Sequence, residues 1–233
     1  MSKSLGNFWT VREALENYDP LVLRHALLNA HYRSPIDLTE QLLEDAKGHH
    51  AKLVEAYGHA LVITEQAKKA GMQEAPRLPQ ADVASPDFLS SKLGLLEKLL
   101  QEAAIAMDDD FNSRQALAKV SNGARLIPQI LNNEEIDERD TAAFAMYAID
   151  WLEEFAGRVL GLLPSEEVAM AVHDPSLDPA RQAIKDQVEQ LLARRAIARA
   201  AKDWDSADEI RDALAEMGVS VKDTPDGVVW TLD

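Results

Sequence analysis

The sequence contains no cysteine at any of its 233 positions, so disulfide bonds and thiolate metal sites are excluded within the chain. It also lacks a run of eighteen apolar residues, which argues against a transmembrane helix. Its start shows no apolar signal-peptide core. The six histidines include no pair four residues apart, so no helical two-histidine metal motif is present. We therefore expect a cytoplasmic protein without a metal site or a membrane partner.

What the chain has in excess is negative charge, with 40 acidic against 24 basic residues and a net charge of −16. The distribution is uneven. Residues 181–202 carry six basic and two acidic side chains, and residues 1–33 are also slightly basic. Local basic segments allow an acidic protein to bind RNA while the remainder repels phosphate. The charge permits a nucleic-acid partner but does not demonstrate one.

Most of the chain is predicted to be helical. Asp19 followed by Pro20 is typical of an N-cap and a first helical position. Asp37 with Glu40 resembles a capping box at the start of a long helix that Gly71 closes. Apolar periodicity predicts three more long helices, at about 86–106, 114–132 and 137–161. Aromatic residues at 144–155 are expected in the core of the resulting antiparallel bundle.

A second, smaller domain is predicted after a proline-containing stretch. Residues 162–178 are typical of a linker, and two helices are expected at 179–202 and 205–217. Two β-branched runs then flank Thr224–Gly227, which is typical of a hairpin turn. The predicted fold class is mainly α: an antiparallel helical bundle with a small C-terminal helical hairpin and a β-ribbon.

Three short segments carry candidate chemistry, each with a structural alternative. In Met1–Asn7, a lysine between two serines can meet phosphate charge, although such termini are usually frayed. The acids Asp108–Asp110 could bind a metal, but acids at a helix junction more often act as caps and solvated loop. Trp204, between two aspartates, could plug the small domain or stack on a base.

Four segments together resemble a known family. Met1–Asn7 resembles the KMSKSLGN loop of class I aminoacyl-tRNA synthetases, and Tyr18–Ser34 resembles the segment that follows it. Met107–Leu117 resembles the MDDDFNTPxAL hallmark of cysteine–tRNA ligases, and Ala201–Trp230 resembles their small C-terminal domain. The order is the family's order. The chain is therefore identified as resembling the C-terminal half of a bacterial-type cysteine–tRNA ligase, from the KMSKS loop onward.

The resemblance implies an enzyme that activates cysteine with ATP and Mg²⁺ and attaches it to tRNA(Cys). It implies zinc only in a catalytic half that this chain lacks. The chain alone is then not expected to be catalytic, being a fragment or one product of a split gene with a separate catalytic chain. The implied site residues are Lys3 for catalysis, Ser2, Lys3 and Ser4 for ATP, and Arg199, Trp204, Asp208 and Asp223 for the anticodon.

The same resemblance suggests the domain organisation and leaves two alternative functions. The expected parts are the signature loop with its connecting segment, the tRNA-binding bundle, a linker and the anticodon-recognition domain, at 1–36, 37–163, 164–178 and 179–233. One alternative is a free-standing tRNA-binding module, against which the retained lysine loop argues. The other is a synthetase-like cysteine ligase acting on a small molecule, against which the anticodon-type tail argues.

Overall fold

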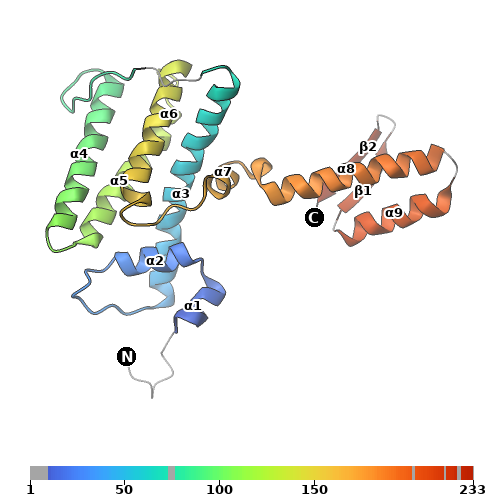
Figure 1. Ribbon diagram of the computed structural model, residues 1–233, viewed down its shortest axis with the longest axis horizontal. Helices are drawn as coiled ribbons and strands as arrows, with labels where there is room; N and C mark the ends of the chain where they lie inside the picture. The colour runs from blue at the N-terminus through green and yellow to red at the C-terminus, as the bar shows by residue number, and fades with distance from the viewer. Residues whose placement is uncertain (1–9, 73–76, 201–202, 218, 225–226, 233) are drawn as a thin grey trace. The chain divides into compact units, whose positions relative to one another are not determined.

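The computed structural model describes residues 10–72, 77–200, 203–217, 219–224 and 227–232. It divides into two compact units, Met1–Pro175 and Ser176–Asp233 (Figure 1). Both are mainly helical, and a two-stranded sheet belongs to the second, so the predicted fold class is confirmed. Among the described helices, none combines the length and the apolar character that crossing a bilayer requires.

Four long helices form the body of the first unit. Consecutive helices run in opposite directions (Figure 1). Of the four, α5 packs against α4, α3 and α6, and α3 also packs against α6. Their core includes the fully buried Phe144, Leu96 and Ile127. Two short helices, α1 and α2, precede α3, and a further one, α7, packs on it. The elements are α1 (Val11–Asn17), α2 (Pro20–Leu28), α3 (Glu40–Lys69), α4 (Phe88–Asp108), α5 (Ser113–Leu131), α6 (Glu138–Leu152) and α7 (Glu166–His173).

The helix starts show where local signals were sufficient. At α2, the Asp19 carboxylate accepts from the Leu21 amide at 2.7 Å and Pro20 is the first residue, as predicted. At α3, the predicted Asp37 start is wrong: Thr39 is the N-cap and accepts from the Leu42 amide at 3.2 Å. A capping side chain reaches the second or third amide of a helix only from the position directly before it. Asp37 lies two residues too early.

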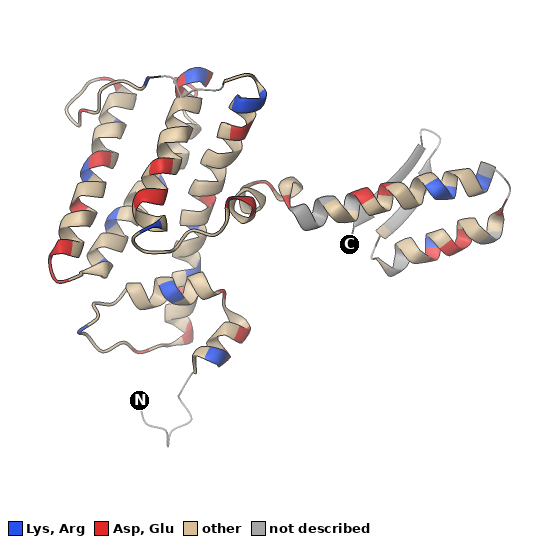
Figure 2. Ribbon diagram, in the orientation of Figure 1, with Lys and Arg blue, Asp and Glu red and all other residues tan. Residues whose placement is uncertain are grey.

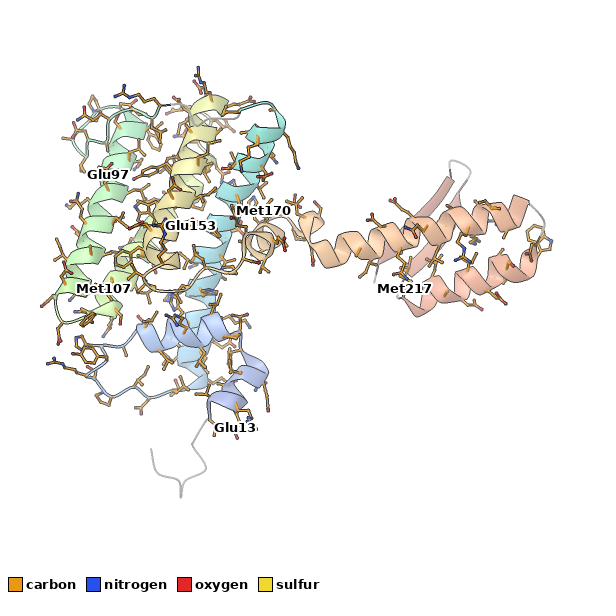
Figure 3. The ribbon with its side chains drawn as sticks, viewed as in Figure 1. Glu13, Glu97, Met107, Glu153, Met170 and Met217 are labelled. Carbon is orange, nitrogen blue, oxygen red and sulfur yellow. The ribbon has the colours of Figure 1, made fainter. Side chains whose placement is uncertain are left out.

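The helix predicted for 137–161 ends earlier, because α6 passes into a π-helical turn, η2 (Glu153–Gly157). There the Arg158 amide donates to the Glu153 carbonyl five residues back, at 2.8 Å. Figure 3 labels Glu153 at this end of α6, and its carboxylate accepts from the Tyr57 hydroxyl of α3 at 2.8 Å. The following Leu160 carbonyl accepts from Arg24 Nε at 2.6 Å, which ties α2 to the turn.

The segment 164–178, predicted as a linker, contains α7 and a 3₁₀ turn, η3 (Pro175–Leu177). Ala169 of α7 is fully buried against α3. A Cβ added at Gly58 would lie 2.0 Å from the Ala169 carbonyl oxygen, so only glycine allows this approach. The rings of His59 and His173 stack at 4.3 Å, and His173 Nδ1 lies 2.6 Å from Glu55 Oε1. These contacts bind α7 to the bundle.

The second unit is a helical hairpin with a β-ribbon. It consists of α8 (Pro179–Ala200), α9 (Trp204–Glu216), β1 (Val219–Thr224) and β2 (Gly227–Leu232). The strands pair antiparallel, with Thr224 opposite Gly227, as the turn signal predicted. The core is small: Val188, Leu214 and Val219 are buried, and Met217, labelled in Figure 3, packs against them.

Candidate nucleic-acid interface

Trp204 is the first residue of α9, and Asp203 determines where that helix begins. Its carboxylate accepts from the Ser206 amide at 3.2 Å and from the Ser206 hydroxyl at 2.7 Å. These hydrogen bonds lower the pKa of Asp203, with that from the hydroxyl contributing most. The Trp204 side chain is 58% exposed and is not part of the small core. The cap therefore holds an exposed indole at the hairpin end, and the structure does not support the plug alternative.

Asp208 lies one helical turn after Trp204, so both side chains are on one face of α9. Its Oδ1 lies 3.1 Å from Nη1 of Arg211, three residues further along. Both partners are more than half exposed, and such ion pairs contribute only about 0.3–0.5 kcal/mol. A base edge could compete with so weak a pair. The face thus combines a ring, an acceptor and a guanidinium.

Arg211 is a candidate that sequence reasoning missed. Arg211 lies seven residues after Trp204 and three residues after Asp208, and residues at these spacings share one face of a helix. This spacing was the signal in the sequence. Arg199 is exposed in the last turn of α8, and Figure 2 shows further basic residues earlier in the second half of that helix. The backbone of Asp223 lies in β1 opposite Val228. Ser2, Lys3 and Ser4 lie outside the described residues.

Two further motif segments meet in the first unit. The Asp110 carboxylate accepts from the Tyr32 hydroxyl at 2.8 Å and from Arg33 Nη2 at 2.9 Å. His31 Nε2 lies 3.7 Å from the same carboxylate. The hydroxyl of Ser113, the first residue of α5, donates to the Leu28 carbonyl at 3.0 Å. The segments following α2 and α4, far apart in sequence, are thereby joined.

The acidic junction between α4 and α5 has a structural function here. Asn112 caps α5 by accepting from the Gln115 amide at 3.2 Å, and Asp110 bonds to Tyr32 and Arg33. In the described part of the chain, no group of three His, Cys, Asp or Glu side chains is arranged to hold a metal. Phe111, which follows these acids, is 69% exposed with a φ of 52°. The backbone turn points this ring outward.

Comparison with known proteins identifies the chain's relatives. A family model described as the cysteinyl-tRNA ligase anticodon binding domain matches residues 181–230. A model of the class I (C) tRNA synthetase catalytic domain matches residues 1–48, and the DALR domain model matches residues 104–164. The three matches follow one another along the chain and include both the signature loop and the exposed face of α9.

Curated relatives match over almost the whole chain. The cysteine–tRNA ligase of Geobacter sulfurreducens is 41% identical over 99% of this chain and 44% of its own length. That of Pelobacter propionicus is 37% identical over 100% of the chain and 46% of its own length. The chain therefore spans about half the length of the curated relatives it matches. From these matches and the three family models, the chain belongs to the cysteine–tRNA ligase family.

Proposed function

We propose that this chain forms part of an enzyme that activates cysteine with ATP and Mg²⁺ and attaches it to tRNA(Cys) in the cytoplasm. The observation that carries the proposal is the ordered match to synthetase catalytic, DALR and anticodon-binding family models. An anticodon-binding domain at residues 181–230 favours this function over a ligase that acts on a small molecule. The relatives, named as cysteine–tRNA ligases, support the same choice.

The signature loop would contribute to the activation step. When the cysteine carboxylate attacks the α-phosphorus of ATP, negative charge grows on the departing pyrophosphate. The Lys3 ammonium is proposed to stabilise this charge in the transition state, and the hydroxyls of Ser2 and Ser4 to donate to phosphate oxygens. Zinc is not assigned to this chain, because the described residues offer no fitting group of ligands. No step is derived through a metal.

The second unit would read the anticodon. Single-stranded RNA is recognised by stacking bases on aromatic or guanidinium planes and by hydrogen bonding to their edges. Trp204 supplies an exposed ring, and Asp208 supplies acceptors for exocyclic amino groups. Arg199 and Arg211 supply donors on α8 and α9, and Asp223 is proposed as a second acceptor. Carboxylates repel phosphate, so their presence favours base reading over mere backbone attachment.

The role of Lys3 is testable in an enzyme that joins this chain to a complete nucleotide-binding domain. Lys3→Ala is expected to slow cysteine-dependent exchange of pyrophosphate into ATP about a hundredfold, the usual loss for one transition-state charge contact. Binding of tRNA should change little. Lys52→Ala, which removes an exposed lysine from α3, is the control. Exchange by Lys3→Ala at the parental rate would contradict the catalytic role.

The role of Trp204 is testable in the 233-residue chain itself. Trp204→Ala is expected to weaken binding of cysteine tRNA by about 1–3 kcal/mol, the contribution of stacking on one base. Its free energy of unfolding should stay within about 0.5 kcal/mol of the parent, because the ring is exposed. Fluorescence anisotropy at one fixed salt concentration measures the first quantity, and chemical denaturation measures the second.

Two companion variants separate stacking from edge reading. Trp204→Phe keeps an aromatic plane and should recover most of the lost affinity. Asp223→Asn should instead relax discrimination between anticodon bases while leaving overall affinity closer to the parent. If Trp204→Ala unfolds the second unit, the ring has a structural role and the stacking assignment is wrong.

A further inference from the structure

A small pocket lies between α2, α3 and α5, within the first unit and remote in sequence from the proposed ATP and anticodon residues. Its volume is about 140 Å³. His25 and Leu117 are buried, whereas His49, Asn122 and Arg125 are exposed side chains around it. The remaining lining residues are Asn29, Ala118 and Ser121. None of the eight carries a negative charge, in a chain whose net charge is −16.

His25 is the unusual member of this group. It is only 2% exposed, and within the described residues both of its ring nitrogens lack a hydrogen-bond partner. The neighbouring His50 is not a hydrogen-bond partner of His25, because His50 Nε2 donates to the Leu162 carbonyl at 2.8 Å. Buried polar groups are nearly always hydrogen-bonded, so an unpaired imidazole beside a pocket calls for a ligand or a water.

The side chains around the pocket are also available for binding. In the part of the chain that the structure describes, the side chains of Asn29, Asn122 and Arg125 make no hydrogen bond or ion pair with other protein groups. A guanidinium, two carboxamides, a hydroxyl and two imidazoles therefore border one small volume. Each of these groups can donate a hydrogen bond.

The electrostatic setting favours an anion. The helices α2 and α5 contain no aspartate or glutamate, and α5 carries Arg114, Lys119 and Arg125. Lys119 is paired with Glu102 of α4 at 2.7 Å, which leaves Arg114 and Arg125 as the uncompensated charges of α5 among the residues that the structure describes. A local excess of positive charge in an otherwise acidic protein concentrates anions at that place. The nearest acid in the sequence of α3 is Asp45, one turn before His49, and its carboxylate accepts from Gln41 at 2.8 Å. It is not among the lining residues.

We propose that this pocket binds a single phosphate group. The planar fork of Arg125 matches two phosphate oxygens, and the remaining oxygens can accept from the carboxamides, the serine hydroxyl and the imidazoles. A hard divalent cation is disfavoured, because no carboxylate lines the pocket and Arg125 would repel it. The phosphate can belong to an RNA backbone or to a free phosphate compound, since both present the same oxygens.

The proposal is tested with the full 233-residue chain and inorganic phosphate at constant ionic strength. Imidazole signals of His25 and His49, followed by NMR, are expected to shift saturably with phosphate and not with chloride. Arg125→Gln should weaken phosphate binding about tenfold, the effect of losing a charge-assisted hydrogen bond. Arg139→Gln, an exposed arginine at the start of α6, should bind like the parent.

Further measurements separate the possible ligands. If cysteine tRNA displaces the bound phosphate, the ligand of the pocket is an RNA phosphate. If phosphate binds saturably and cysteine tRNA does not displace it, the ligand is a free phosphate compound. Either result supports the site, and neither depends on whether the chain reads an anticodon. Three results would overturn it: no saturable shift, equal loss in Arg125→Gln and Arg139→Gln, or a response of the two histidines to Zn²⁺ alone. Thermal melts of both variants confirm that the folded protein is compared.

Discussion

Replacing Trp151 by alanine is expected to lower the free energy of unfolding of the helical bundle by about 3–5 kcal/mol, the usual loss for a buried aromatic side chain. Trp151 is 3% exposed in the middle of the core. Its Nε1 donates to the Leu96 carbonyl of α4 at 2.9 Å. The truncation would remove this bond and leave a cavity between α4, α5 and α6. Chemical denaturation followed by circular dichroism measures the loss.

The partner of Trp151 on α5 provides a sharper test of the same packing. A Cβ at Gly123 would lie 2.1 Å from Cη2 of the indole, so Gly123→Ala should destabilise the parent by about 1–3 kcal/mol. In the Trp151→Ala background the same change should be neutral or stabilising, because the clash is gone and alanine favours a helix. A double-mutant cycle reveals this reversal of sign. Equal effects in both backgrounds would contradict the proposed contact.

Lowering the pH from 6.5 to 4 is expected to cost the bundle about 3 kcal/mol through His25 alone. Burial, together with the neighbouring His50 and His49, lowers the pKa of His25 from its usual 6.5 to about 4. The folded state therefore binds this proton less readily than the unfolded state. The contribution of neutral His25 to the free energy of unfolding is complete above pH 6.5. It falls progressively as the pH drops below 6.5 and is lost once the pH passes below about 4.

Two measurements check the His25 prediction. Titration of its ring signals by NMR should show a midpoint near 4 in the folded protein. His25→Gln removes the titrating group. Between pH 7 and pH 4, the free energy of unfolding of this variant should therefore fall by about 3 kcal/mol less than that of the parent. The variant can be less stable at every pH without affecting this comparison. A midpoint near the ordinary histidine value would show that burial does not keep the ring neutral.

Some differences between expectation and structure arise from signals that were present but incompletely read. Thr10 with Glu13 forms a full capping box at α1, with the Thr10 amide 2.7 Å from the Glu13 carboxylate. At Arg211, the spacing of seven residues from Trp204 indicated a shared face of α9, and the spacing of three residues from Asp208 is typical of a helical ion pair. Such features are local, and a closer reading of offsets along one helix would recover them.

The sequence by itself determined the features that arise within a few residues. Asp19 and Pro20 start α2, Thr224 and Gly227 close the hairpin, and the ordered motifs identify the family, because caps, turns and motifs act over short offsets. Only the tertiary structure decided which distant segments meet. Asp110 lies 77 positions from Arg33 in the sequence, yet the two side chains are hydrogen-bonded.

The same distinction explains α7 and the pocket around His25. The sequence of 164–178 is typical of a linker, yet it contains the helix α7, whose Ala169 is buried against α3 because Gly58 lets the two backbones approach. The pocket gathers side chains from three helices that are separated in the sequence. Such arrangements depend on packing between elements, which no local pattern encodes, since each helix satisfies its own backbone hydrogen bonds whatever lies beside it.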